Sequence, residues 1–176
     1  MKKKRPSKIA QQPEPPVLLL EAEIAQGLEQ LVWDELQEQF GDTVRLEQMG
    51  QAAIRFWYRG ALRRFWTPLA QSVYHVQTFD VPRPKALLGD QHFRALTTQI
   101  DRVRQLSPKD YQSFYVNAAG SESSIMQRLR QILAASTGLA DRPEQGDLLI
   151  RIRRSPGQES SWETLVRISP RPFATR

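Results

Sequence analysis

Arginines, rather than catalytic groups, are the residues of this sequence best suited to interact with another molecule. The chain has no cysteine, which excludes thiolate nucleophiles and cysteine zinc sites. Its two histidines, His75 and His92, do not have the spacing of metal ligands, and no Gly-x-Gly-x-x-Gly loop or Gly-x-Ser-x-Gly motif is present. We therefore predict no catalytic residue and no metal site. An enzyme whose site forms only at a dimer interface is the alternative.

Charged residues occupy positions in the second half of the chain where folding alone would accept Thr or Ser. The segments DLLIRIRRS and SWETLVRIS, over residues 147–155 and 161–169, alternate apolar side chains with arginines. Near the start of a predicted helix, Ser121 and Ser123 offer hydroxyl and amide groups to a phosphate, although they are equally suited to act only as helix caps. The predicted RNA-binding residues are Arg94, Ser121, Ser123, Arg128, Arg130, Arg151, Arg153, Arg154 and Arg167.

The charges are distributed unevenly. The formal net charge is +6, and residues 1–8 carry five positive charges and no negative one. Residues 9–58 hold nine acids against two arginines, whereas residues 59–176 hold 18 bases against ten acids. Such a polarised surface suits a polyanion bound by one part of the protein, with charges kept for solubility as the alternative.

Hydrophobic periodicity predicts strand, helix, strand, strand, helix, strand within residues 17–80, the order of a ferredoxin-like βαββαβ subdomain. The second of these helices has Leu62, Phe65, Trp66 and Leu69 on its apolar side, which favours a core position for Trp66 over stacking on a base. Trp57 faces away from its apolar neighbours, so stacking on a base and packing are both open to it.

A second α/β unit is predicted over residues 81–170, after a linker rich in proline. Its helix begins near Ser121 or Ser123 and ends before Gly138, between a strand around Phe114 and the two arginine-containing strands. The predicted fold class is therefore α+β, with residues 1–16 as a disordered basic tail and residues 171–176 as the start of a linker. The lack of cysteine and of a long apolar run predicts a cytoplasmic protein that does not enter the membrane.

Three segments carry a resemblance to a known family. The first is the segment IAQGLEQLVWDELQEQF. The second is the stretch from Gly50 to Leu69 with the SVYHVQTF strand after it. The third is SFYVNAAGSESSIMQRLRQIL with the two following strands. Over about residues 16–170 the chain resembles the N-terminal ferredoxin-like plus THUMP region of S-adenosylmethionine-dependent RNA (guanine-N2) methyltransferases. The resemblance assigns residues 17–80 to the ferredoxin-like subdomain and residues 81–170 to the THUMP domain.

The resemblance implies a module that binds structured RNA, rRNA or tRNA, and positions it for base methylation. The family's catalytic domain, with its Asn/Asp-Pro-Pro-Tyr type motif, has no counterpart in this sequence, so S-adenosylmethionine is expected only in a methyltransferase domain supplied in cis or in trans. We expect this chain to be a fragment, the product of a split gene or a stand-alone module. The alternative function is a protein-interaction module that docks an acidic partner and has no RNA role.

Overall fold

The computed structural model describes residues 16–158 and 160–173 of the 176-residue chain. Residues 1–15 of the predicted tail and residues 174–176 of the predicted linker lie outside the described residues, so both predictions remain untested there.

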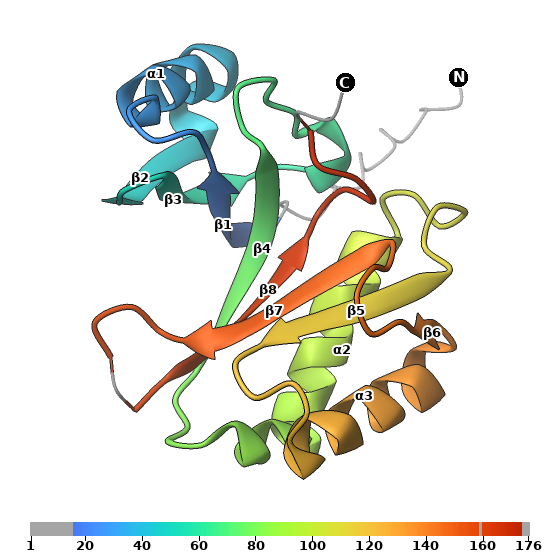
Figure 1. Ribbon diagram of the computed structural model, residues 1–176. Helices are drawn as coiled ribbons and strands as arrows, with labels where there is room; N and C mark the ends of the chain where they lie inside the picture. Colours follow the sequence, from blue (N-terminus) through green and yellow to red (C-terminus); the bar gives the residue numbers. More distant parts are fainter. Residues whose placement is uncertain (1–15, 159, 174–176) are drawn as a thin grey trace, which may run out of the picture.

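Within that range, eight strands form a single sheet in the order β2-β3-β1-β4-β8-β7-β5-β6, accompanied by three α-helices (Figure 1). The α+β class predicted from the sequence is confirmed. The strands are β1 (Val17–Glu23), β2 (Val44–Met49), β3 (Ala53–Arg59), β4 (Ser72–Phe79), β5 (Ser113–Ala118), β6 (Ala140–Asp141), β7 (Leu148–Arg154) and β8 (Trp162–Arg167). The α-helices are α1 (Glu29–Phe40), α2 (Asp90–Arg104) and α3 (Ser124–Thr137), and the 3₁₀ helices are η1 (Gly41–Thr43), η2 (Leu62–Arg64) and η3 (Pro84–Leu88).

The strands predicted within residues 17–80 all form, and their pairings are antiparallel: β1 lies between β3 and β4, and β2 pairs with β3. The second predicted helix is wrong, because only the single 3₁₀ turn η2 forms there. Pro68 explains the difference. A proline cannot donate the helical hydrogen bond and disfavours the helical conformation of the residue before it, so the chain after η2 is extended.

The strands and the helix predicted from Ser113 onward are present. Helix α3 begins after Ser123, whose hydroxyl accepts a hydrogen bond from the Met126 amide, and ends at Gly138 in the left-handed conformation. Strand β7 pairs antiparallel with β8 and parallel with β5, and the two-residue strand β6 was not predicted. Strands β4 and β8 pair from Tyr74–Arg167 to Phe79–Trp162, which makes one continuous sheet of the two predicted parts.

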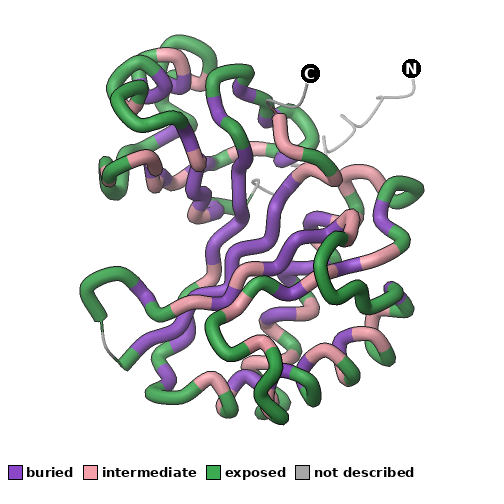
Figure 2. Tube along the Cα trace, viewed as in Figure 1, coloured by how far each residue is buried: buried purple, intermediate pink, exposed green. Residues whose placement is uncertain are grey.

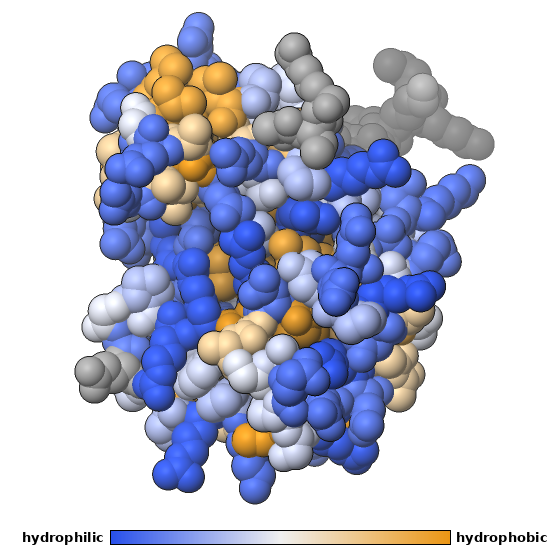
Figure 3. Space-filling view, in the orientation of Figure 1, coloured by the Kyte–Doolittle hydropathy of each residue, from blue (hydrophilic) through white to orange (hydrophobic). Residues whose placement is uncertain are grey.

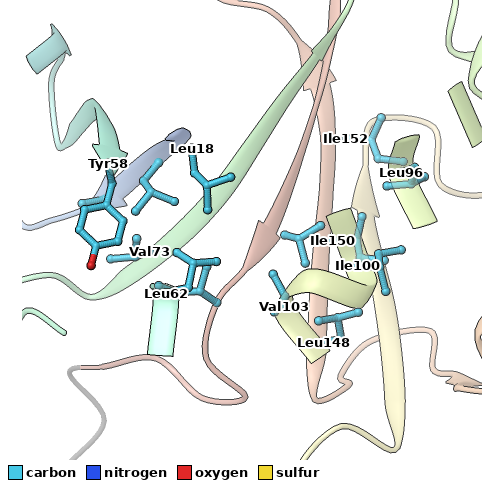
Figure 4. Packing of buried hydrophobic residues seen from close by; sticks show 14 of the residues in the cluster. Leu18, Tyr58, Leu62, Val73, Leu96, Ile100, Val103, Leu148, Ile150 and Ile152 are labelled. Atoms are coloured by element: carbon cyan, nitrogen blue, oxygen red, sulfur yellow. The ribbon is translucent and has the colours of Figure 1, made fainter. Parts of the chain in front are cut away.

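Helices cover one face of this sheet. Alternate residues of the strands, such as Leu18 and Leu20 of β1 and Ile150 and Ile152 of β7, join residues of α1, α2, α3 and η2 in one core. Figure 4 shows Leu96, Ile100 and Val103 of α2 facing β7, while Leu62 of η2 lies with Leu18, Tyr58 and Val73. The central strands are accordingly buried along most of their length (Figure 2).

The opposite side of the sheet, here called the helix-free face, holds the other alternate residues of the strands. Its small apolar cluster contains no residue of the described helices and consists of Leu19, Tyr74, Val76, Tyr115, Leu149 and Leu165. Charged residues of β1, β3, β7 and β8 surround this cluster, and Figure 3 shows apolar atoms at the centre of the view bordered by hydrophilic side chains.

Candidate nucleic-acid interface

The structure does not bring the predicted RNA-binding residues together at one site. Arg151 and Arg153 of β7 and Arg167 of β8 lie on the helix-free face. The remaining residues belong to the other side of the sheet or to its ends: Arg94 on α2, Ser121 and Ser123 before α3, Arg128 and Arg130 on α3, and Arg154 at the end of β7.

Arg153 belongs to a cluster of two arginines and two glutamates. Arg55 of β3 donates from both terminal nitrogens to Glu163 of β8, at 2.8 and 2.9 Å, and from Nη2 to Glu21 of β1 at 2.7 Å. Arg153 donates to Glu21 and Glu163 as well. The Glu163 side chain is 1% exposed and that of Arg55 is 12% exposed, so this is a buried and electrically balanced cluster.

The cluster joins strands that are not neighbours in the sheet. In the strand order, β1 and β7 are three positions apart, and so are β3 and β8. In a flat sheet, strands three positions apart are about 14 Å from each other. The long side chains of arginine and glutamate therefore bridge the strands that lie between them.

A second ion pair on this face joins Arg151 of β7 to Glu23 of β1, with two contacts of 3.1 and 3.2 Å. The guanidinium of Arg151 also lies 4.6 Å from the centre of the Tyr74 ring. Burial raises the pKa of the Tyr74 hydroxyl to about 12, so the hydroxyl is protonated at neutral pH and donates to Glu23. Arg167 of β8 is buried, and its donors bind the carbonyl oxygens of Ser169 and Pro170.

The pKa shifts agree with this structural role. Burial by itself would raise the pKa of Glu21, but hydrogen bonds from Arg153 and Arg55 outweigh burial and lower it. Burial lowers the pKa of Arg167, whose polar partners are neutral carbonyls. Arg151, Arg153 and Arg167, which looked excessive in the sequence, are thus bonded within the protein, and Arg151 and Arg153 connect the first predicted part to the second.

Except for Arg130, the remaining predicted residues meet at one end of the sheet. Strand pairing brings the ends of β4 and β7 to the start of β8, since Trp162 pairs with both Phe79 and Arg154. Ala118, the last residue of β5, pairs with Ile152. Helix α2 begins beside Phe79, whose ring lies 5.7 Å from that of His92, and η3 contacts α3. The first turns of α2 and α3 therefore lie at this end of the sheet.

We call this surface the basic end and define it by its exposed cations Arg83, Lys85, Arg94, Arg128 and Arg154, together with Ser121 and Ser123. The acidic residues Asp80, Asp90 and Glu122 belong to the same segments, so the five cations exceed the acids by two. The positive ends of the α2 and α3 dipoles add to the favourable potential for an anion.

Individual side chains at the basic end differ in how free they are. Arg94 and Arg128 are exposed, and their side chains have no hydrogen-bond or ion-pair partner among the described residues. Arg154 lies over the indole of Trp162, 5.4 Å from the ring centre. Ser123 is the cap of α3, as the structural alternative predicted, and Ser121 makes a long hydrogen bond of 3.4 Å to Glu122.

Two outcomes at this surface differ from the sequence analysis. Arg130 lies elsewhere, with Nε 3.3 Å from a carboxylate oxygen of Asp141, in an ion pair too poorly aligned to count as a hydrogen bond. Arg83 and Lys85 were not among the predicted RNA-binding residues, because they lie in the proline-rich segment predicted to be a linker. The sequence RPK, with two cations flanking a proline at the start of η3, is the feature that could have indicated them.

The described part of the chain offers little else for chemistry. Among residues 16–158 and 160–173, no group of three or more His, Asp or Glu side chains could hold a metal ion. No helix in those ranges is long and apolar enough to cross a lipid bilayer.

Comparison with solved structures finds similar chains. TrmN from Thermus thermophilus matches 90% of this chain with a TM-score of 0.59 and 18% sequence identity. A possible methylase from Clostridium difficile 630 (TM-score 0.46, 11% identity) covers 86% of this chain and 41% of that one. The match to a predicted N6-adenine-specific DNA methylase from Listeria monocytogenes str. 4b F2365 (TM-score 0.48, 12% identity) covers 86% of this chain and 40% of the methylase chain. The chain spans about half the length of TrmN, since the match covers 48% of that chain.

Comparisons of sequence give no match, either to a protein-family model or to a curated protein. At 18% identity, the similarity to TrmN establishes a common fold.

Proposed function

We propose that this chain binds structured RNA, rRNA or tRNA, at the basic end and positions it for base methylation by a methyltransferase domain in cis or in trans. In this proposal residues 17–80 are a ferredoxin-like subdomain and residues 81–170 a THUMP domain. S-adenosylmethionine would be bound by the methyltransferase domain. The fold shared with part of the TrmN chain supports this assignment.

One observation carries the proposal. Exposed cations from three separate parts of the sequence, η3 with α2, α3 and the end of β7, meet at the basic end, and the side chains of Arg94 and Arg128 among them have no partner in the described chain. Phosphate groups of a folded RNA present negative charges, and arginine binds them with paired hydrogen bonds. The alternative, an acidic protein partner, would meet the same cations but would not require a ribose-phosphate backbone.

The test is a titration of labelled tRNA and of an rRNA hairpin by fluorescence anisotropy at several salt concentrations. We expect Arg94→Glu with Arg128→Glu to weaken binding about tenfold or more and to reduce the salt-dependence slope by about 2, one for each lost phosphate contact. Neither side chain is bonded within the described chain, so the unfolding transition should stay in place.

The matched control is Lys109→Glu with Arg171→Glu, which changes the net charge by the same amount. Both residues are exposed and lie at the other end of the sheet, before β5 and after β8. Equal losses in the two double variants would mean that only total charge matters, and RNA binding that is insensitive to salt would contradict the proposal. Tight binding of an acidic peptide without binding of RNA would support the alternative function.

A further inference from the structure

We propose that a second surface, the η2 segment (Arg63, Arg64 and Trp66), binds an unpaired nucleotide of the RNA by stacking its base on Trp66. This inference rests on the proposed function for the identity of the ligand, but it concerns residues outside the basic end. It gives a role to the most exposed tryptophan of the described chain.

Trp66 is exposed although the sequence pattern placed it in the core. Its side chain is 55% exposed, whereas Phe65 before it and Thr67 after it are 5% and 0% exposed. Extended backbone at Phe65 produces this alternation, because successive side chains then point to opposite sides. A large aromatic side chain held outside a core that its neighbours fill is the kind of exposure that calls for a function.

The two neighbours fix the backbone of Trp66. The Phe65 ring stacks on Phe40 with ring centres 5.0 Å apart, and it also packs against Phe56 and Tyr58. The Thr67 hydroxyl donates a 2.9 Å hydrogen bond to Glu35 of α1. Since both flanking side chains are anchored, Trp66 is presented on a rigid support, and a stacking partner loses little free energy to ordering of the backbone.

Two cations lie just before this tryptophan, separated from it by Phe65. Arg63 and Arg64 are exposed, and neither side chain has a hydrogen-bond or ion-pair partner within residues 16–158 and 160–173. Their turn is anchored by Leu62, which is 6% exposed. Gly60 permits this close packing, because a Cβ at that position would lie 2.3 Å from the Tyr58 hydroxyl oxygen.

An exposed aromatic ring beside unpaired arginines matches the chemistry of single-stranded nucleic-acid binding. The ring stacks on a base of any identity and the guanidinium groups neutralise the adjoining phosphates. Nothing in the segment is arranged to read the edge of a base, so the expected preference is for unpaired over paired nucleotides rather than for a sequence.

The experiment compares a blunt RNA hairpin with the same hairpin carrying a short single-stranded extension, each titrated with the full chain. We expect the extension to strengthen binding and Trp66→Ala to remove that gain, a loss of about 5- to 150-fold for one stacked base. Trp66→Phe, which keeps an aromatic face, should retain most of the gain. Arg63→Gln with Arg64→Gln should reduce the salt-dependence slope by about 1.4 for the extended RNA.

Tryptophan fluorescence supplies a second readout. Trp33 and Trp162 are buried, whereas Trp66 is exposed, so stacking should quench the fluorescence of the wild type more than that of Trp66→Phe. An extension that adds nothing to binding, or a gain that survives in Trp66→Ala, would overturn the inference. So would a Trp66→Ala effect seen only on binding to anionic lipid vesicles or on self-association.

The two proposals fail in different ways. If the proposed function is wrong, the blunt hairpin will not bind and the basic-end variant will change nothing. If only the present inference is wrong, the blunt hairpin will bind in a manner that depends on Arg94 and Arg128, and the extension will add no affinity.

Discussion

Replacement of Glu163 by glutamine should destabilise this protein more than any loss of a surface ion pair. Glutamine keeps the shape of the side chain but removes its charge, and its amide nitrogen then faces the donors of Arg55. Two arginines would remain against Glu21 alone, inside a cluster where Arg55 is 12% exposed. We expect a loss of about 3–5 kcal/mol in the free energy of unfolding, the usual cost of leaving a buried charge uncompensated. Because Arg153 is 37% exposed and can reach water, the lower part of that range is expected.

Two further variants test the reasoning. Glu23→Gln breaks an ion pair whose side chains are 30% and 37% exposed, so its cost should be below about 1 kcal/mol. Arg55→Met combined with Glu163→Leu removes one charge of each sign and leaves Glu21 with Arg153. The double variant should therefore be less destabilised than the sum of its two single variants, with a coupling of about 2 kcal/mol or more.

Urea denaturation is the suitable assay, because guanidinium chloride would screen the ion pairs under study. Unfolding can be followed by the fluorescence of the buried Trp33 and Trp162 together with circular dichroism. A cost of less than 1 kcal/mol for Glu163→Gln, or strict additivity in the cycle, would refute the idea that this cluster holds the two parts of the sheet together.

Two other outcomes are expected. His75 is buried, and burial, reinforced by the charge of Arg102, lowers its pKa from 6.5 to about 4. Between about pH 4 and about pH 6.5, His75 is protonated in the unfolded chain but not in the folded chain. The contribution of His75 to stability is therefore full above about pH 6.5 and is lost as the pH is lowered toward 4. The free energy of unfolding measured in urea should be about 2 kcal/mol lower at about pH 5 than at about pH 7, and His75→Gln should lack that part of the loss. Ser123→Ala removes the cap of α3 and should cost about 1 kcal/mol in the same assay, whereas an unchanged midpoint would show that the hydrogen bond to Met126 contributes nothing.

Pro68 shows the limit of a local pattern. Leu62, Phe65, Trp66 and Leu69 fit a helical stripe, but Pro68 within that stretch does not allow a continuous helix. The extended chain that forms instead sends Phe65 inward and Trp66 outward. A candidate nucleotide contact thereby emerged from a residue that the sequence had assigned to the core.

The sequence by itself determined most of the elements of this protein, including the strands from Val17 onward, the start of α3 at its serine cap and its end at Gly138. It could do so because the periods of helix and strand and the chemistry of caps are local. Only the tertiary structure decided what the arginines do. Arg55 and Glu163 are separated by 108 positions and meet because the sheet is continuous, and no local pattern records such a partner. The same sheet places Arg151 and Arg153 in internal ion pairs, while the side chains of Arg94 and Arg128 are free at the basic end.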